Sequence, residues 1–285
     1  MFIKMGYKIL KKEYLNRNNL LIQVHAPLVA YKARAGQFVI LRPFCDSERI
    51  PLTISDYDSG AGVITLIFAP VGETTAELAS LNVGNEICDV CGPLGNPTET
   101  DGIKEAVVIG GGVGAAIALP VAKELKNNGA EVTAILGFRN KDLIILEKEF
   151  LSVCDKVIVT TDDGSYGEKG SVVVPLNALL SESKPDCVIA IGSVVMMKFV
   201  SLATKPFGVK TVVSMNPIMI DGTGMCGGCR LTVGGETRFA CVDGPDFDGH
   251  LVDFDELLKA NARFSGFEHK RKESCGLFSK AGEKL

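Results

Sequence analysis

The chain has 285 residues, of which 46% are hydrophobic, and a net charge of −4 at neutral pH. This length and composition suit two domains with sizeable cores, and the acidic balance does not predict nucleic-acid binding. The longest uncharged run, residues 106–122, contains four glycines and a proline. It therefore predicts a strand, a tight loop and a helix rather than a membrane span.

The N-terminus and the cysteines predict a cytoplasmic protein. The first residues contain no apolar stretch like that of a secretory signal. Nine cysteines in such a chain indicate a reducing compartment, with thiols that are free or bound to metal. Cys88 and Cys91 form an isolated C-x2-C pair, for which buried thiols are the preferred interpretation. The other isolated cysteines are Cys45, Cys154, Cys187 and Cys275.

Residues 1–98 predict an all-β domain. Short runs rich in Val, Ile, Leu and Thr alternate with Gly, Pro, Asn and Asp, a pattern typical of a barrel or a sandwich. The expected strands are residues 20–24, 36–41, 62–68 and 84–90, and residues 74–81 are expected to form a short helix.

Two short motifs in this β domain have the chemistry of a flavin site. Arg49 can clamp a pyrophosphate, and the strand after it can present backbone groups and a hydroxyl to a planar ring. Gly72 and the threonines that follow precede a helix start, where N–H groups bind anions. Taken alone, each motif is an ordinary strand or capped turn. The candidate FAD-binding residues are Arg49, Pro51, Leu52, Thr53, Ile54, Gly72, Thr74 and Thr75, with Thr53, adjacent to the flavin, as the candidate catalytic residue.

A turn-rich linker at residues 95–102 precedes a change of pattern. Residues 103–215 alternate strand-like apolar runs with helical ones, which predicts a parallel α/β sheet. The expected strands are residues 105–109, 131–136, 156–160, 187–191 and 210–214, and helices are expected at residues 115–127 and, beyond the sheet, 253–262.

The loop after the first of these strands is rich in glycine. Gly110, Gly111, Gly112, Val113 and Gly114 stand between a strand and a helix, where backbone N–H groups can approach a pyrophosphate. A tight turn without a ligand is the alternative. The strand and the helix on either side favour dinucleotide binding.

The acid that usually ends the second strand of a dinucleotide-binding fold is missing, because residues 136–139 contain none. Asp162 and Asp163 instead close the next strand. Their carboxylates would accept hydrogen bonds from a ribose diol and repel a 2′-phosphate, which favours NAD(H) over NADP(H). Arg139 and Lys141 oppose that preference, and a surface turn is the alternative for the acidic pair.

Asp221, Cys226, Cys229 and Cys241 form the pattern D-x4-C-x2-C-x11-C in a glycine-rich segment. Plant-type two-iron clusters are held by C-x4-C-x2-C and a distant fourth cysteine, so the pattern fits a 2Fe-2S cluster with aspartate in first place. Zinc is an alternative, although only one C-x2-C is present, and so are metal-free thiols. Because a hydride carries two electrons and such a cluster takes one, a flavin between them completes the set.

These motifs occur in the same order in the ferredoxin–NADP reductase superfamily, which the chain resembles over roughly residues 1–260. More narrowly, it resembles the small subunits of NADH-dependent reduced ferredoxin:NADP oxidoreductase, also called sulfide dehydrogenase subunit beta. The aspartate at position 221 is the most specific mark of that family. The narrower likeness is carried by residues 51–54, 162–167, 216–219, 221–226 and 242–245.

The resemblance implies an architecture, a set of cofactors and a partner. It implies an FAD-binding antiparallel β-barrel (1–98), a parallel-sheet NAD-binding α/β domain (103–215), a 2Fe-2S segment (216–250), and a C-terminal helix and tail (251–285). Electrons would pass from NAD(H) through FAD and the cluster. The implied partner is a larger flavoprotein with FAD and 4Fe-4S clusters, forming a heterodimer that reaches ferredoxin and NADP(H).

The likeness has gaps. Many superfamily members have Cys-Gly-Pro beside the nicotinamide, and the matching stretch here has Gly192 and Ser193, so Gly192 is a candidate NAD-binding residue without a neighbouring thiol. Many relatives have tyrosine in place of Pro51. Two alternatives stay open, namely the electron-transfer subunit of dihydroorotate dehydrogenase, which uses four cysteines, and a non-enzymatic redox or metal-binding module. Electron bifurcation is likewise left open.

Overall fold

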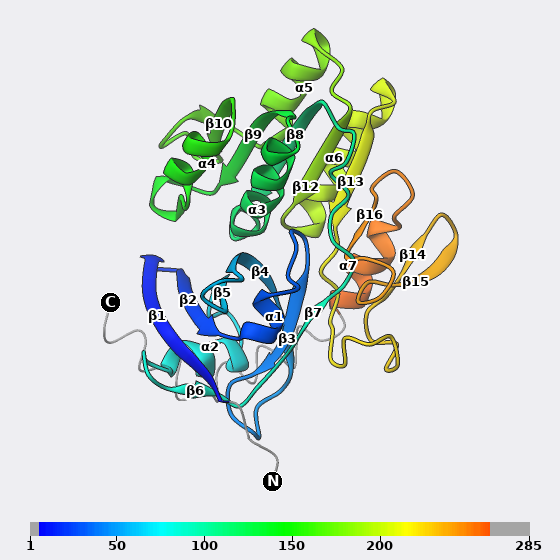
Figure 1. Ribbon diagram of the computed structural model, residues 1–285. Helices are drawn as coiled ribbons and strands as arrows, with labels where there is room; N and C mark the ends of the chain where they lie inside the picture. The colour runs from blue at the N-terminus through cyan, green and yellow to red at the C-terminus, as the bar shows by residue number, and fades with distance from the viewer. Residues whose placement is uncertain (1–5, 263–285) are drawn as a thin grey trace.

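The computed structural model describes residues 6–262, and Figure 1 shows two sheets, one above the other. The lower sheet has the strand order β6-β1-β2-β5-β4-β3-β7, with every neighbouring pair antiparallel. Its strands are β1 (Tyr7–Asn16), β2 (Asn19–His25), β3 (Phe38–Arg42), β4 (Ile50–Asp58), β5 (Val63–Phe68), β6 (Glu86–Ile87) and β7 (Asp89–Leu94), and its helices are α1 (Pro27–Ala30) and α2 (Glu73–Ser80).

The two edge strands of this sheet are consecutive in the chain. β6 ends at Ile87 and β7 begins at Asp89, so a single residue, Cys88, joins opposite edges of the sheet. The sheet therefore curves round on itself into a nearly closed barrel. Alternate residues of β2, such as Leu20 and Ile22, point into the barrel and are fully buried in its core.

The upper sheet has the order β11-β10-β9-β8-β12-β13-β16 and is parallel except at β16. Its strands are β8 (Glu105–Gly111), β9 (Glu131–Phe138), β10 (Lys156–Thr161), β11 (Glu168–Lys169), β12 (Cys187–Ile191), β13 (Lys210–Ser214) and β16 (Asp246–Asp248). The helical segments between them are α3 (Gly114–Asn127), η1 (Lys141–Leu143), α4 (Glu147–Val153), α5 (Val173–Glu182), α6 (Val194–Thr204) and η2 (Lys205–Phe207).

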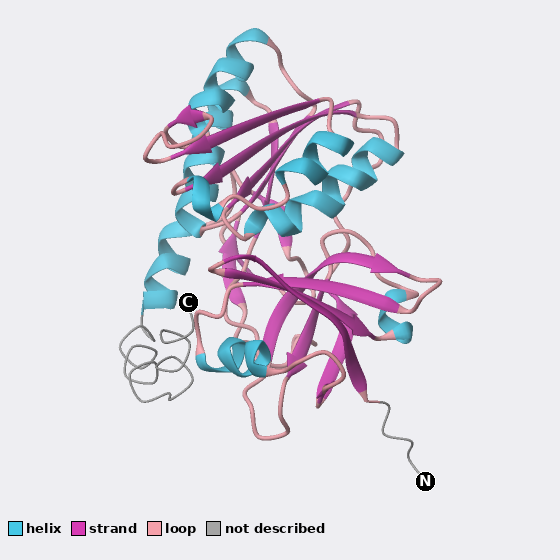
Figure 2. Cartoon of the chain, turned by 90° about the vertical axis from the view of Figure 1, so that its left-hand side faces the viewer, coloured by secondary structure: helices cyan, strands magenta, loops and turns pink. Residues whose placement is uncertain are grey.

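Helices cover both faces of the upper sheet, as Figure 2 shows. In β8, Val107 and Ile109 face a cluster that includes residues of α5 and α6. Ala106 and Val108 face the opposite cluster, which includes residues of α3 and α4. Because side chains alternate along a strand, a sheet covered on both faces has apolar residues at successive positions, as the sequence shows here.

The last described part of the chain packs beside both sheets (Figure 1). β14 (Arg230–Val233) and β15 (Glu236–Phe239) form a hairpin across two glycines, and α7 (Phe254–Ala262) follows. The loop before the hairpin contacts the barrel, because a Cβ on Gly222 would lie 2.7 Å from Leu94. Asn96, which follows β7, donates from its backbone N–H to the Gly244 carbonyl at 2.7 Å and from its side chain to the Val242 carbonyl at 3.1 Å.

The fold class predicted from the sequence is confirmed, and the predicted strands and helices are present with small shifts at their ends. The run at residues 84–90 forms two strands because the barrel closes at Cys88. β1 was missed because three lysines and one glutamate interrupt its apolar pattern, and Ile9 is its one buried residue. No helix in residues 6–262 is both long and apolar enough to cross a bilayer. The expected tail beyond residue 262 lies outside the described residues.

The prediction of free or metal-bound thiols is wrong for two cysteines. Cys45 and Cys88 form a disulfide across 43 positions of sequence. The sequence could not show this pair, because the pairing of β3 with β7, which are far apart in the chain, brings Cys88 beside the loop after β3. Cys91, Cys154 and Cys187 are free, whereas Cys275 lies outside the described residues.

Candidate functional site

A glycine turn joins β8 to α3 where the upper sheet reverses its direction of winding. β8 lies between β9 and β12, and such a switch point opens a crevice at the carboxyl ends of the strands. Gly112 has a φ of +56°, and nothing lies within 4 Å of the position of its Cβ. A Cβ on Gly114 would instead overlap the Ile191 carbonyl. Gly112 therefore leaves space above the turn, and Gly114 allows close packing of α3 on β12.

A cavity of about 830 Å³ lies at this turn. Four of the predicted NAD-binding residues line it, namely Gly111, Gly112, Val113 and Asp162, whereas Gly110, Gly114, Asp163 and Gly192 do not. Lining residues that the sequence analysis missed include Phe138, Thr160, Ser171, Val172, Val195, Met196 and Phe199. Most of them lie at the ends of β9 and β10 or the starts of α5 and α6, where parallel sheets bind ligands, so strand ends were the available signal.

The two aspartates after β10 have different surroundings. Asp162 lines the cavity together with Arg139. Asp163 accepts a hydrogen bond from the Ser165 N–H at 2.9 Å, and hydrogen bonds from Ser165 hold the pKa of Asp163 below its ordinary value. Asp163 thus stabilises a turn, so the choice between NAD(H) and NADP(H) stays a prediction that depends on Asp162 and Arg139.

The topology brings the two flavin motifs to one end of the barrel. In the antiparallel pair of β4 and β5, Ile54 lies opposite Leu66. The start of β4, next to Arg49, is therefore at the same end as the last residues of β5. The turn with Gly72 follows β5, and α2 begins one residue later. A ligand that binds both motifs would lie across this end of the sheet.

The residues of β4 differ in what they can offer to a flavin. Pro51, Leu52 and Thr53 are half-buried. The Ile54 side chain is 1% exposed within the barrel core, and its N–H donates to the Gln37 carbonyl at 3.0 Å. Thr53, half-buried and next to the core residue Ile54, has the one side-chain hydroxyl among residues 51–54.

The turn at α2 uses part of its own hydrogen-bonding capacity. The Thr75 hydroxyl accepts from the Gly72 N–H at 2.9 Å and donates to the Gly72 carbonyl at 2.8 Å. This pair stabilises the start of the helix. Thr74 is buried, so an anion at this turn would be bound mainly by backbone N–H groups at the start of the helix.

Arg49 connects the barrel to the cluster segment. Its Nε donates to the Ile220 carbonyl at 3.0 Å, and one of its terminal nitrogens lies 3.9 Å from Asp89. Asp221 accepts hydrogen bonds from the hydroxyl and the N–H of Thr223. These bonds, with a smaller contribution from the Arg49 charge, lower the pKa of Asp221. One guanidinium thus contacts the residue directly before the first predicted cluster ligand.

The four predicted cluster ligands form two pairs. The sulfur atoms of Cys229 and Cys241 are 3.2 Å apart and buried. Cys226 is exposed and lies close to Asp221, whose N–H and charge both act on its thiol. Among the described residues, no three Cys, His, Asp or Glu side chains converge on a position for a single metal ion. Two pairs suit a two-iron cluster, in which each iron takes two protein ligands, better than a single zinc ion, which needs four.

Backbone N–H groups point at the Cys226 thiol, and the Gly228 N–H lies 3.5 Å from its sulfur. Hydrogen bonds from the N–H groups of Gly228, Asp221 and Ile220 lower the pKa of Cys226, against opposing effects of burial and the Asp221 charge. Donors directed at sulfur are what an anionic iron–sulfur core requires. The ligand loop, residues 221–229, also contains three glycines with positive φ, Gly222, Gly224 and Gly227, which let the backbone wrap closely. The residues present therefore fit a 2Fe-2S cluster.

Comparison with known proteins agrees with this geometry. A family model described as the iron–sulfur cluster binding domain of dihydroorotate dehydrogenase B matches residues 216–253. A Thermotoga maritima homologue of the electron-transfer subunit of that enzyme is 46% identical over 277 residues, 97% of each chain. The chain belongs to the dihydroorotate dehydrogenase B electron-transfer subunit family. Within this family, the Streptococcus pneumoniae subunit is 40% identical over 222 residues, 75% of this chain and 85% of that protein.

Solved structures refine this placement in the electron-transfer subunit family. A chain from the structure of an NADH-dependent reduced ferredoxin-NADP oxidoreductase, studied for flavin-based electron bifurcation, is 43% identical with a TM-score of 0.89. The structural alignment covers 96% of this chain and 98% of the chain from the oxidoreductase. A ferredoxin reductase of carbazole 1,9a-dioxygenase, 17% identical with a TM-score of 0.61, shares the fold. The resemblance predicted from the sequence is confirmed.

Proposed function

We propose that this chain is an iron–sulfur flavoprotein that transfers electrons between NAD(H) and a larger partner subunit. The observation that carries the proposal is the contact of Arg49, from the flavin motif, with Ile220, in the cluster segment. It joins two sites that a hydride-to-single-electron path needs close together. The cavity at Gly112 supplies the third site.

Each group would be held by residues of a different part of the fold. FAD would lie across the barrel end formed by β4 and the turn at α2, bound by Arg49, residues 51–54, Gly72, Thr74 and Thr75. NAD(H) would occupy the cavity at the turn between β8 and α3, against residues 110–114, Asp162 and Gly192. The ligands of a 2Fe-2S cluster would be Asp221, Cys226, Cys229 and Cys241.

The residues named above would orient these groups relative to one another. When bound, FAD accepts a hydride and releases single electrons, which a 2Fe-2S cluster can take. Arg49 would fix the phosphates at one end of the flavin and, through Ile220, the position of the cluster loop. Thr53 would place its hydroxyl beside the ring. The site then works by orientation alone, because hydride transfer needs the donor and acceptor aligned.

The proposed partner surface surrounds the cluster segment. Ile218, Ile220, Met225 and Val242 expose 42%, 53%, 87% and 42% of their surface, and all lie in or beside the ligand loop. An exposed apolar patch at a cofactor is typical of a protein interface. We propose that it binds a larger flavoprotein with FAD and 4Fe-4S clusters, which exchanges electrons with ferredoxin and NADP(H) in a cytoplasmic heterodimer.

Anaerobic purification tests this proposal directly. FAD, iron and acid-labile sulfide would be quantified, and visible spectra recorded before and after addition of NADH. We expect one FAD and a two-iron cluster per chain, and bleaching of both by NADH. A colourless protein with zinc and no flavin would contradict the proposal and support a metal-binding module.

The names of the curated relatives favour a second candidate function. Several are electron-transfer subunits of dihydroorotate dehydrogenase B, which is named as NAD(+)-dependent. In that case the partner would be a dihydroorotate-oxidising subunit. Co-expression with each type of partner, followed by reduction of NAD(+) with dihydroorotate or with reduced ferredoxin, distinguishes the two.

A further inference from the structure

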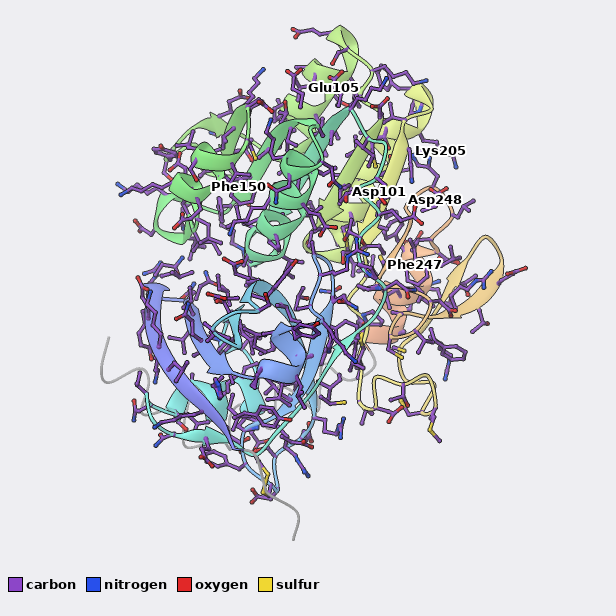
Figure 3. The ribbon with its side chains drawn as sticks, viewed as in Figure 1. Asp101, Glu105, Phe150, Lys205, Phe247 and Asp248 are labelled. Carbon is purple, nitrogen blue, oxygen red and sulfur yellow. A yellow bond between two sulfur atoms is a disulfide. The ribbon has the colours of Figure 1, made fainter. Side chains whose placement is uncertain are left out.

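The disulfide between Cys45 and Cys88 has no role in the proposed electron path. It lies on the barrel, and Figure 3 draws it as a yellow bond between two sulfur atoms. Cys45 is exposed in the loop between β3 and β4, and Cys88 is the half-buried residue that joins β6 to β7. Exchange with an external thiol requires access to one sulfur, and Cys45 provides it.

The disulfide closes the loop that ends in Arg49. Residues 43–49 connect β3 to β4, and the disulfide ties Cys45 in this loop to the residue directly before β7, the strand that pairs with β3. Non-covalent contacts also hold the loop, among them hydrogen bonds from Arg42 to the Cys45 carbonyl at 2.9 Å and from the Cys88 N–H to the Pro43 carbonyl at 2.9 Å. Loss of the covalent link would give these residues more conformational freedom.

The same disulfide sits next to both members of the pair of Arg49 and Asp89. Asp89 directly follows Cys88, and its carboxylate lies 3.9 Å from Arg49 and 3.5 Å from Arg42. Arg49 follows Cys45 by four positions. The disulfide therefore holds the guanidinium and its carboxylate partner in fixed relation, on the barrel side of the Ile220 contact.

We propose that Cys45 and Cys88 form a reversible thiol–disulfide exchange site that accepts electrons from dithiols and sets how firmly the loop holds Arg49. A thiolate of the dithiol attacks the Cys45 sulfur and releases the Cys88 thiolate, which takes up a proton. The second thiolate of the reductant then attacks the reductant sulfur of this mixed disulfide and displaces the Cys45 thiolate, which also takes up a proton. In total, two electrons and two protons pass from the dithiol to the disulfide, which leaves two protein thiols and one oxidised dithiol. A low-molecular-weight disulfide reverses it.

Reduction of the disulfide would have two consequences, namely greater motion of residues 43–49 and faster release of FAD. The faster release rests on the proposed function, because it requires FAD at Arg49. Preorganisation of a binding loop changes affinity by the cost of ordering it, so we expect a difference of about 3-fold to 10-fold in the rate of FAD release. The first consequence, greater motion of residues 43–49, does not depend on any cofactor.

The experiment uses the whole protein, equilibrated anaerobically with graded ratios of small dithiol to its disulfide. Alkylation with mass mapping reports thiol state, hydrogen exchange reports residues 43–49, and fluorescence reports released FAD. We expect Cys45 and Cys88 to become alkylated together, with faster exchange in the loop and faster FAD release. Cys45→Ser and Cys88→Ser should each behave as the reduced form at every ratio.

Cys91→Ser is the matched control, because Cys91 is a free, half-buried cysteine three positions from Cys88. It should respond to the dithiol as the wild type does. Full alkylation of Cys45 and Cys88 before any reduction would overturn the proposal, and so would loop exchange that is the same in both states. If the wild type binds no FAD, the proposed function fails, while the exchange data still decide the fate of the thiol pair.

Discussion

The Nε of Arg49 donates a hydrogen bond of 3.0 Å to the carbonyl oxygen of Ile220, 171 positions further along the chain. Arg49 belongs to the barrel, and Ile220 precedes the first predicted cluster ligand. A neutral carbonyl that accepts from a guanidinium gains a charge-assisted bond with defined direction. The contact therefore couples the position of the cluster loop to the loop that would bind the flavin phosphates.

Replacement of Arg49 by lysine should affect both sites. Lysine keeps the charge but loses the planar donor set, so we expect FAD affinity to fall about tenfold, the loss of roughly one charge-assisted bond. The EPR signal of the reduced cluster should shift as well. Arg42→Lys is the control, because Arg42 shares Asp89 but has no bond to Ile220. An unchanged cluster signal in Arg49→Lys would show that the Ile220 contact does not influence the cluster.

Asp221→Cys should retain a cluster and change its electronic properties. Cysteine completes the plant-type pattern of four thiolates, and a softer ligand in place of a carboxylate changes the EPR spectrum and the reduction potential. Iron content should stay at two per chain. Asp243→Asn, which alters another carboxylate of the same segment, should keep the wild-type spectrum. Identical spectra for Asp221→Cys and the wild type would mean that Asp221 is not a ligand.

Gly112→Ala should block nucleotide binding while the protein stays folded. The residue has a φ of +56°, so alanine costs about 1 kcal/mol of stability. Its Cβ would enter the open space above the turn, where a pyrophosphate would lie, and NADH affinity should fall at least about tenfold. Titration of NADH and thermal melting measure the two effects.

Gly129→Ala is matched to that variant. Gly129 has a φ of +86°, and nothing lies within 4 Å of the position of its Cβ. It lies outside the cavity at the β8–α3 turn. Its stability should fall by a similar amount, with NADH affinity unchanged. Equal losses of NADH affinity in both variants would show that the nucleotide does not bind at the β8–α3 turn.

Asp246 should make stability fall as pH rises from acid to neutral. Its Oδ1 is enclosed without a hydrogen-bond partner, while Oδ2 accepts from the Thr98 hydroxyl at 2.6 Å. Burial raises the pKa of Asp246, against the smaller effect of hydrogen bonds. The folded state therefore favours the protonated carboxyl. The contribution of Asp246 to the free energy of unfolding is complete below the ordinary aspartate pKa. It is lost as the pH rises through the raised pKa of the folded state.

Asp246→Asn should remove this dependence and increase the free energy of unfolding at neutral pH by about 1 kcal/mol, because no buried charge remains. Denaturant unfolding at several pH values tests it. Asp142→Asn, at an exposed position, should give a curve parallel to that of the wild type. Parallel curves for all three proteins would show that Asp246 does not titrate in this range.

The sequence revealed the sheets because their signals are local. Strand runs such as residues 106–109 are apolar at every position, since both faces of the sheet are covered. The hairpin of β14 and β15 also had a local signal that was overlooked, because Gly234 and Gly235 separate two short strands and both have positive φ. The spacing of the cluster ligands was visible for the same reason.

The contacts between distant segments could not be predicted. The pairing of Cys45 with Cys88 depends on which barrel strand pairs with β3. The bond between Arg49 and Ile220 depends on where the last segment packs. Arg139 and Asp162 lie on successive βα loops, and only the order of strands brings both to one cavity. The chemistry of each side chain follows from the sequence. Which distant residue it contacts depends on the fold.

The two bonds of Asn96 to the backbone at Gly244 and Val242 have a consequence for protein engineering. They attach the segment with the predicted cluster ligands to the residues that follow β7. This segment therefore cannot be exchanged between homologues by itself. A chimera that swaps residues 216–253 between homologues would graft a loop without its anchor. Transplants that carry residues 95–98 with the segment should assemble, and shorter ones should accumulate as insoluble protein.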